Sequence, residues 1–200
     1  MRTEFTIPSN GIGNLHCCRW TPEGEAKAVV QIVHGIAEYI ERYDDFASYL
    51  NSLGYVVVAE DHMGHGQSVG EQGTQGYFEG GWFTAVSDSY SLLRKTKEEY
   101  PGVPYILFGH SMGSMIARDF STKYGNELAG VVYCGTTGIF KNTHEVRAKL
   151  DEAIAAGRAH ESDPAFVGEL MGWMFARCSE GAERGNEWIC HDPEVQRDHA

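Results

Sequence analysis

The sequence predicts an α/β protein, built from a mostly parallel sheet with flanking helices. Four short apolar runs, rich in Val, Ile and aromatic residues, alternate with stretches of helical periodicity. The runs are unbroken, which is typical of strands buried on both faces of a parallel sheet. They span residues 29–35, 55–61, 104–110 and 129–136.

A β-hairpin is predicted ahead of these runs, at the N-terminus. The segments "TEFTIP" and "LHCCRW" flank "SNGIGN", in which the Asn-Gly pair favours a tight turn. The hairpin would add two strands to the sheet.

Three helices are predicted between the four runs, over about 43–53, 83–100 and 111–124. In each stretch apolar residues recur on one helical face, which would pack on the sheet. Gly54 ends the first helix, a Pro-Gly pair ends the second and Gly125 ends the third.

The composition changes after about residue 137. Glu, Arg, Gly and Ala dominate the remainder, which has helical patterns at 145–156 and 164–177. We therefore divide the chain into a core, residues 1–137, and a helical cap or lid segment, residues 138–200. The second of these helices carries an apolar stripe that either packs the segment onto the core or faces an acyl chain: Phe166, Leu170, Trp173 and Met174.

Composition limits the classes of partner. The formal net charge of −12 argues against a nucleic-acid partner, because a phosphate-binding surface needs clustered Lys and Arg. The N-terminus lacks the apolar segment of a signal peptide, and no run of apolar residues could span a bilayer, so we expect a cytoplasmic protein. The five cysteines show no C-x-x-C spacing, and we expect them to be reduced and mostly packed.

The segment "GHSMG" places Ser111 between two glycines, directly after a predicted strand and before a predicted helix. This arrangement is the nucleophile elbow, a turn so sharp that the serine hydroxyl stands exposed above the sheet edge. Gly109 and Gly113 are expected because a Cβ at either position would collide with neighbouring backbone. His110 and Gly113 support the elbow.

Backbone amides near the serine are predicted to form an oxyanion hole. The N–H of Met112 lies at the start of the third helix, where the helix dipole favours negative charge. A second donor is expected from "VHGIAEY", the loop after the first run, and Ile36 is the candidate. His34 and Gly35 are expected to support this loop.

The dense segment "EDHMGHGQS" does not complete a metal site. His62 and His65, beside Asp61, could be two metal ligands, but no third and fourth ligand is suitably spaced, so we expect no metal. We expect Asp61, His65 and Ser68 to be structural. The glycines nearby form neither G-x-G-x-x-G nor a Gly-Lys-Ser/Thr segment, so no nucleotide or other cofactor is expected.

These segments together resemble the serine α/β-hydrolases of the monoacylglycerol lipase and lysophospholipase group, over residues 1 to about 138. The resemblance implies hydrolysis of a carboxylic ester with one acyl chain through an acyl-serine, with Ser111 as nucleophile and the amides of Ile36 and Met112 as oxyanion hole. It also implies a small-molecule lipid ester as substrate. Transient contact of the cap with a membrane surface and self-association are further partner expectations. Ala37 stands where relatives often have glycine.

The acid and base of a catalytic triad are the main departure from the family pattern. In this fold they follow the serine, acid first and then His, on loops after two further strands, and no such strand is predicted after residue 136. The tail offers carboxylates and histidines, but a cap is not where the family keeps its triad: Asp151, Asp163, Asp192, Asp198, His144, His160, His191 and His199. We expect the acid and base to lie outside this chain, and the 200 residues alone to be inactive. A non-catalytic acyl-binding protein and a Ser-dependent enzyme of other chemistry remain alternatives.

Overall fold

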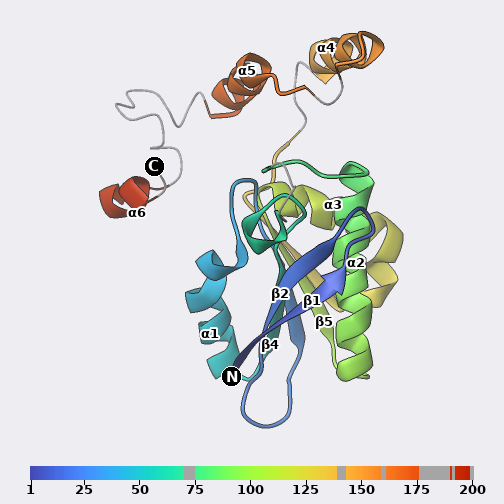
Figure 1. Ribbon diagram of the computed structural model, residues 1–200. Coiled ribbons are helices and arrows are strands. Elements are labelled where there is room, and N and C mark those ends of the chain that lie inside the picture. The colour runs from blue at the N-terminus through green and yellow to red at the C-terminus, as the bar shows by residue number, and fades with distance from the viewer. Residues whose placement is uncertain (70–74, 139–142, 159–160, 176–189, 191, 199–200) are drawn as a thin grey trace. The chain divides into compact units, whose positions relative to one another are not determined.

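The computed structural model describes residues 1–69, 75–138, 143–158, 161–175, 190 and 192–198 (Figure 1). The chain divides into two compact units, Met1–Gly138 and Ile139–Ala200. Each unit is described by itself below.

A six-stranded sheet forms the centre of the first unit, with strand order β1-β2-β4-β3-β5-β6 (Figure 1). The strands are β1 (Arg2–Pro8), β2 (Asn14–Trp20), β3 (Val29–Val33), β4 (Val56–Glu60), β5 (Tyr105–His110) and β6 (Gly130–Cys134). The pairs β4–β3, β3–β5 and β5–β6 are parallel, whereas β1–β2 and β2–β4 are antiparallel. The predicted α/β class, mostly parallel sheet and N-terminal hairpin are confirmed.

Burial follows the position of each strand in the sheet. All residues of β3 and β4 are buried, as their unbroken apolar runs predict. In contrast, β6 is half-buried to exposed, because no described strand pairs with its outer side.

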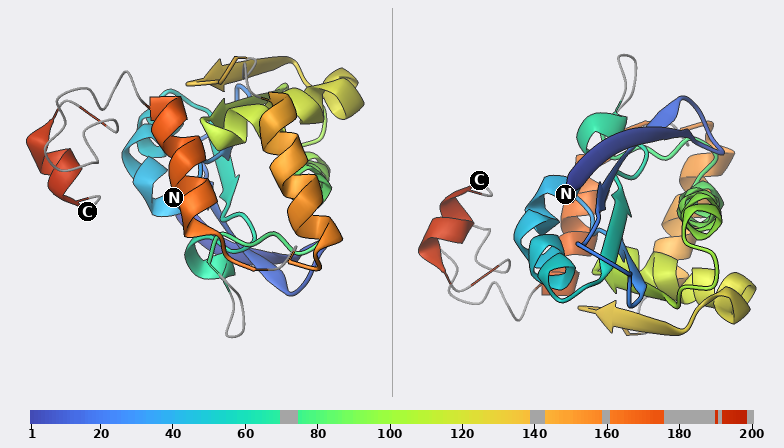
Figure 2. Two further views of the ribbon diagram at one scale, coloured as in Figure 1. Left: turned by 90° about the horizontal axis from the view of Figure 1, so that it is seen from above. Right: turned by 90° about the horizontal axis from the view of Figure 1, so that it is seen from below.

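Helices cover both faces of the sheet. The helical elements of this unit are η1 (Ile40–Tyr43), α1 (Asp44–Ser52), η2 (Gly66–Ser68), α2 (Trp82–Glu99), α3 (Met112–Tyr124) and η3 (Gly125–Glu127). α1 lies on one face, and α2 and α3 lie on the other (Figure 2). Successive side chains of β4 point to opposite faces of the sheet and so enter two separate hydrophobic clusters. Val56 and Val58 pack with residues of α2 and α3, whereas Val57 and Ala59 pack on the side of α1.

The hairpin loop is longer than the Asn-Gly pair suggests. Five residues, 9–13, connect the last pair of the ladder, and the Ser9 N–H donates to the Gly13 carbonyl at 3.1 Å. Buried Asp88 on α2 accepts the Ser9 hydroxyl at 2.7 Å and the Asn10 backbone N–H at 2.6 Å. The tight-turn prediction was wrong: the loop has five residues, and the contacts with Asp88 hold it together with its own local hydrogen bonds.

The second unit is helical, with α4 (Thr143–Ala155), α5 (Pro164–Phe175) and α6 (Pro193–Asp198). α4 and α5 fall where helices were predicted, and α6 was not predicted. Of the expected apolar stripe, only the side chain of Phe166 lies within the described part, where it is half-buried. Among the described residues, no helix is long and apolar enough to cross a membrane.

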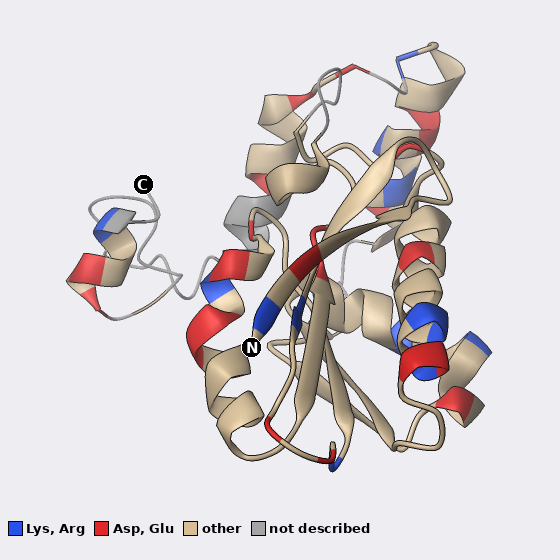
Figure 3. Cartoon of the chain, turned by 60° about the horizontal axis from the view of Figure 1, so that its bottom comes forward, with Lys and Arg blue, Asp and Glu red and all other residues tan. Residues whose placement is uncertain are grey.

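Charged and sulfur-containing side chains are distributed in ways the sequence only partly predicts. Lys and Arg are spread over several elements instead of gathering on one (Figure 3). Cys17 and Cys18 are buried and free, as expected, but Cys134 is exposed on β6. Cys178 lies outside the described residues.

Candidate active site

The turn that carries Ser111 joins β5 to α3 and has a strained backbone. Ser111 has φ 51° and ψ −118°, and a positive φ is uncommon for a residue with a Cβ. Its N–H donates to the Cys134 carbonyl at 2.9 Å, and its carbonyl accepts the Ser114 hydroxyl at 2.6 Å. The serine is therefore held at the carboxyl end of the parallel strands, at the N-terminus of a helix.

Gly109 and Gly113 leave the space that this turn requires. A Cβ on Gly113 would lie 2.5 Å from the His34 carbonyl oxygen and 2.6 Å from the Val33 carbonyl carbon. A Cβ on Gly109 would lie 2.7 Å from the carbonyl carbon of Gly113. These neighbours are backbone atoms in a close-packed interior, so they cannot move aside at low cost.

The loop after β3 lies beside the serine because β3 and β5 are parallel neighbours, with Val33 opposite Gly109. A Cβ on Gly35 would be 3.1 Å from the Ser111 Cβ. Within the described part of the chain, the Ile36 N–H has no hydrogen-bond acceptor. The Met112 N–H opens α3 and so has no intrahelical acceptor. The structure thus brings both predicted oxyanion donors to the loops that flank Ser111.

Glu38 fixes the loop after β3 to the residue that precedes the serine. Its Oε2 accepts the Gly35 N–H at 2.6 Å, the Tyr43 hydroxyl at 2.8 Å and the His110 Nδ1 at 3.0 Å. Arg42 lies 3.7 Å from the other carboxylate oxygen. We call Glu38, Gly35, Tyr43 and His110 the Glu38 clamp.

The clamp favours the charged forms of its two titratable partners. Burial alone would raise the pKa of the Glu38 carboxyl, but hydrogen bonds from His110, Tyr43 and Gly35 outweigh burial and lower it. The hydrogen bond to Glu38 raises the pKa of His110 against the opposing effect of burial. The two side chains therefore form an ion pair over a wider pH range than free groups would.

Two buried histidines, His34 and His62, hold this loop and the loop after β4 together. The His34 Nδ1–H donates to the Gly35 carbonyl at 2.8 Å, and its Nε2 accepts the His62 backbone N–H at 3.0 Å. His62 donates in turn through Nε2 to the His34 carbonyl at 3.1 Å, and its ring centroid lies 3.9 Å from that of His34, with the planes tilted by 35°. Burial lowers the pKa of His34 well below its usual value and that of His62 to about 3. His34 thus contacts both the Gly35 carbonyl and the backbone of the loop after β4.

His65 and Asp61 belong to the same framework. The His65 Nδ1–H donates to the Met63 carbonyl at 3.1 Å. Buried Asp61 accepts the backbone N–H of Ile40 at 2.8 Å and that of Gln67 at 2.9 Å. These contacts tie β4 and its following loop to η1, which agrees with the structural role predicted for both residues.

A catalytic acid and base are not brought to Ser111 by the described residues. The Ser111 hydroxyl has no hydrogen-bonded histidine in the part of the chain that is described. His160, His191 and His199 lie outside it. His144 and the carboxylates Asp151, Asp163 and Asp192 are exposed in the second unit, and the Asp198 side chain is not described.

Glu38 and Tyr43 are the site residues that the sequence reasoning missed. The available signal was a Glu three residues after the Gly of the His-Gly loop, together with a His directly before the serine. Neither contact follows from spacing, because it depends on β3 and β5 being neighbours.

Comparison with known proteins identifies the family. A family model described as "Serine aminopeptidase, S33" matches residues 24–200. The chain belongs to this S33 family. The chain is 37% identical over 139 residues to human monoglyceride lipase, covering 66% of this chain and 45% of that protein. It is 33% identical over 154 residues to a monoacylglycerol lipase of Mycolicibacterium smegmatis, and the match covers 77% of this chain and 52% of that protein.

Two solved structures, of an esterase and of a lipase, are similar to nearly the whole chain. A thermostable carboxyl esterase from Bacillus coagulans, solved with glycerol, has a TM-score of 0.92 and 37% identity, and the match covers 99% of this chain and 64% of that one. A lipase in an open form has a TM-score of 0.89 and 29% identity, and the match covers 100% of this chain and 66% of that one. The α/β-hydrolase fold is confirmed. The chain spans about half the length, or less, of the curated relatives named here.

Proposed function

We propose that this S33 family member is a serine hydrolase that cleaves carboxylic esters with one acyl chain, with Ser111 as nucleophile. The observation that carries the proposal is the strained Ser111 turn, with φ 51° at the start of α3, beside the Gly35–Ile36 loop. Backbone strain at a residue other than glycine is maintained only where the surroundings impose it, and it clusters at functional sites.

The proposed mechanism begins with attack of the Ser111 Oγ on the ester carbonyl carbon. The carbonyl oxygen becomes an oxyanion, which the N–H groups of Met112 and Ile36 stabilise. Each such donor is worth roughly 2.7–4 kcal/mol in the transition state of comparable hydrolases. The alcohol leaves, and water then hydrolyses the acyl-serine and restores the hydroxyl.

A histidine base must accept the serine proton, and the histidines of the first unit are otherwise engaged. His34, His62 and His65 donate to backbone carbonyls, and His110 is bound by Glu38. The remaining one, His16, pairs with Asp61 at 3.0 Å. We therefore place the base and its carboxylate outside residues 1–138, with the acid preceding the histidine as in other enzymes of this fold.

The proposed substrate class is a monoacylglycerol or a lysophospholipid. The relatives are named monoglyceride lipase and monoacylglycerol lipase, and the matching esterase structure contains glycerol. We propose that the second unit, with α4 and α5, acts as a cap over the acyl chain and brings it from a lipid surface.

Turnover by the full-length protein tests the proposal. Monoacylglycerol, lysophospholipid, diacylglycerol and an aminoacyl p-nitroanilide should be compared, since the family description names an aminopeptidase. We expect hydrolysis of single-chain esters, loss of that activity in Ser111→Ala, and no anilide cleavage. Turnover that survives Ser111→Ala would contradict the proposal.

A non-catalytic acyl-binding protein is the second candidate, because no described histidine bonds to Ser111. Acyl-chain binding with no turnover, and with no labelling of Ser111 by a fluorophosphonate, would favour it.

A further inference from the structure

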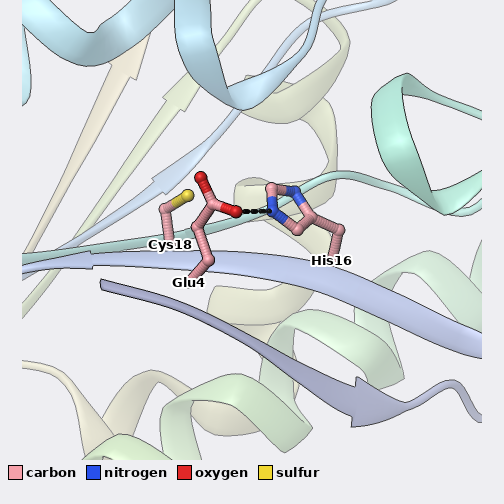
Figure 4. A group of neighbouring side chains, drawn as sticks. All are labelled: Glu4, His16 and Cys18. Carbon is pink, nitrogen blue, oxygen red and sulfur yellow. Dashed lines mark ion pairs between the residues drawn. The ribbon is translucent and has the colours of Figure 1, made fainter. Parts of the chain in front are cut away.

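Three side chains with metal-binding atoms meet on one face of the N-terminal hairpin. Glu4 and Cys18 are directly opposite each other on β1 and β2, and His16 lies two residues from Cys18 on the same face. Figure 4 shows the Glu4 carboxylate between the thiol and the imidazole. A carboxylate oxygen, the His16 ring nitrogen and the Cys18 sulfur all lie within 4.8 Å of one another.

The His16 imidazole points an unpartnered nitrogen into this group. Asp61 lies 3.0 Å from Nδ1, and since a carboxylate only accepts, Nδ1 carries the proton. Nε2 is buried and has no hydrogen-bond partner. Solvent does not readily reach it either, because the His16 side chain is only 9% exposed. It faces Glu4 Oε2 at 3.6 Å. A nitrogen lone pair and a carboxylate oxygen that face each other are two acceptors, and a metal ion between them would satisfy both.

Arg2 does not pair with Glu4 Oε2, the carboxylate oxygen that faces His16. It donates to the other oxygen of Glu4, Oε1, at 2.7 Å, and to the Cys18 sulfur at 3.2 Å. Its charge is also balanced by Asp44 at 3.2 Å. Glu4 Oε2 therefore remains free to act as a ligand, and the guanidinium is placed to hydrogen-bond a thiolate.

We propose that Glu4, His16 and Cys18 form a Zn²⁺ site, with Asp61 orienting the histidine. Nitrogen, sulfur and carboxylate oxygen are the donors zinc uses, and two of its light-atom ligands in tetrahedral geometry are about 3.4 Å apart. The separation of 3.6 Å between His16 and Glu4 matches this value. The carboxylate–histidine contact from Asp61 is the supporting interaction that zinc-bound histidines commonly have. A water completes four-coordination.

A metal ion at the proposed site would link β1 to β2. Through the contact between His16 and Asp61 it would also connect the hairpin to the loop after β4. Zn²⁺ binds a cysteine as the thiolate, so binding at Cys18 would release the thiol proton to solvent. Metal that binds only the folded state should also raise the melting temperature.

Titration of the full-length protein with Co²⁺ and Zn²⁺ tests the site. We expect one equivalent of Co²⁺ to give the d–d absorption of a four-coordinate ion and a thiolate charge-transfer band, both displaced by Zn²⁺. Zn²⁺ should raise the melting temperature. Glu4→Gln and Cys18→Ser should each weaken binding by at least about 100-fold and remove the thermal shift, because each removes a ligand.

Two controls separate this site from adventitious binding. Glu25→Gln changes an exposed carboxylate of the first unit, and Cys134→Ser removes an exposed thiol; neither should alter affinity. Loss of the charge-transfer band in Cys134→Ser, or unchanged affinity in Glu4→Gln and Cys18→Ser, would overturn the proposal. Absence of stoichiometric binding would also overturn it.

Discussion

The carboxylate of Glu38 and the imidazole of His110 lie 3.0 Å apart, although 72 positions separate them in the chain. Through this contact the loop after β3 is fixed to the residue before Ser111. Since Glu38 also accepts the Gly35 N–H at 2.6 Å, the clamp determines where the adjacent Ile36 amide points. We infer that Glu38 is a positioning residue for the proposed oxyanion hole.

Glu38→Gln should lower kcat and leave KM nearly unchanged. The variant removes the charge that holds His110 and weakens the bond to Gly35, so the Ile36 N–H would be misplaced in the transition state. A small displacement of a catalytic group can cost about 10²-fold, and we expect a loss between about 10- and 100-fold in ester hydrolysis. Glu25→Gln serves as the control. A change confined to KM, or none, would remove Glu38 from the mechanism.

Gly113→Ala should destabilise the protein strongly, whereas Gly125→Ala should not. The added Cβ at 113 meets the backbone of Val33 and His34, but the one at Gly125 meets nothing within 4 Å. Overpacking of this kind costs about 3 kcal/mol, equivalent to a melting temperature about 6 °C or more lower for a chain of this size. Thermal melts of the two variants give the comparison. Equal melting temperatures would show that this turn is not tightly packed.

Ala37→Gly should leave stability unchanged or increase it slightly. Ala37 has φ 56°, which costs roughly 1–2 kcal/mol for a residue with a Cβ, and glycine removes this strain while adding about 0.4–1 kcal/mol of entropy loss on folding. Ala85→Gly within α2 should instead cost about 1 kcal/mol or more. Chemical denaturation measures both variants. If Ala37→Gly destabilised the protein as much as Ala85→Gly does, that result would contradict the left-handed conformation of Ala37.

Stability should be greatest near pH 6.5. His34 and His62 have folded pKa values below the ordinary 6.5, so the unfolded chain binds more protons and stability falls as pH drops below 6.5. Burial raises the pKa of Glu60 to about 8. Its contribution to the free energy of unfolding therefore falls as pH rises from 4.5 to 8. Each group changes the free energy of unfolding by about 1.4 kcal/mol per pH unit between its folded and unfolded values. The two histidines therefore outweigh Glu60 below pH 6.5.

Glu60→Gln isolates the alkaline side of this profile. The amide cannot ionise, so the decline between pH 6.5 and 8 should become shallower, whereas the acid side should steepen between pH 4.5 and 6.5. The raised pKa of His110 acts in the same direction as Glu60, because the ion pair with Glu38 is lost as pH rises. Urea unfolding from pH 4 to 9 measures both profiles. Identical alkaline slopes in the parent and the variant would show that Glu60 is ionised in the folded protein.

The sequence predicts features that depend on neighbouring residues or on a simple period. The strands follow from unbroken Val runs, and the Ser111 turn follows from glycines two positions on either side. Contacts between distant segments were not predictable in this way. Glu38 meets His110 only because β3 lies beside β5, and Asp88 contacts the hairpin loop across 79 positions of the chain. The Glu4–His16–Cys18 group likewise requires the register of β1 on β2.

The most direct test of the account is the reaction of full-length protein with a fluorophosphonate, which phosphonylates a serine whose hydroxyl is activated, with loss of fluoride. The adduct is located by mass spectrometry of peptides, with Ser114→Ala as a control that changes a neighbouring hydroxyl. We predict a single adduct on Ser111, retained in Ser114→Ala and absent from Ser111→Ala. An unlabelled Ser111, or an adduct on another serine that accompanies ester turnover, would contradict the claim that Ser111 is the nucleophile.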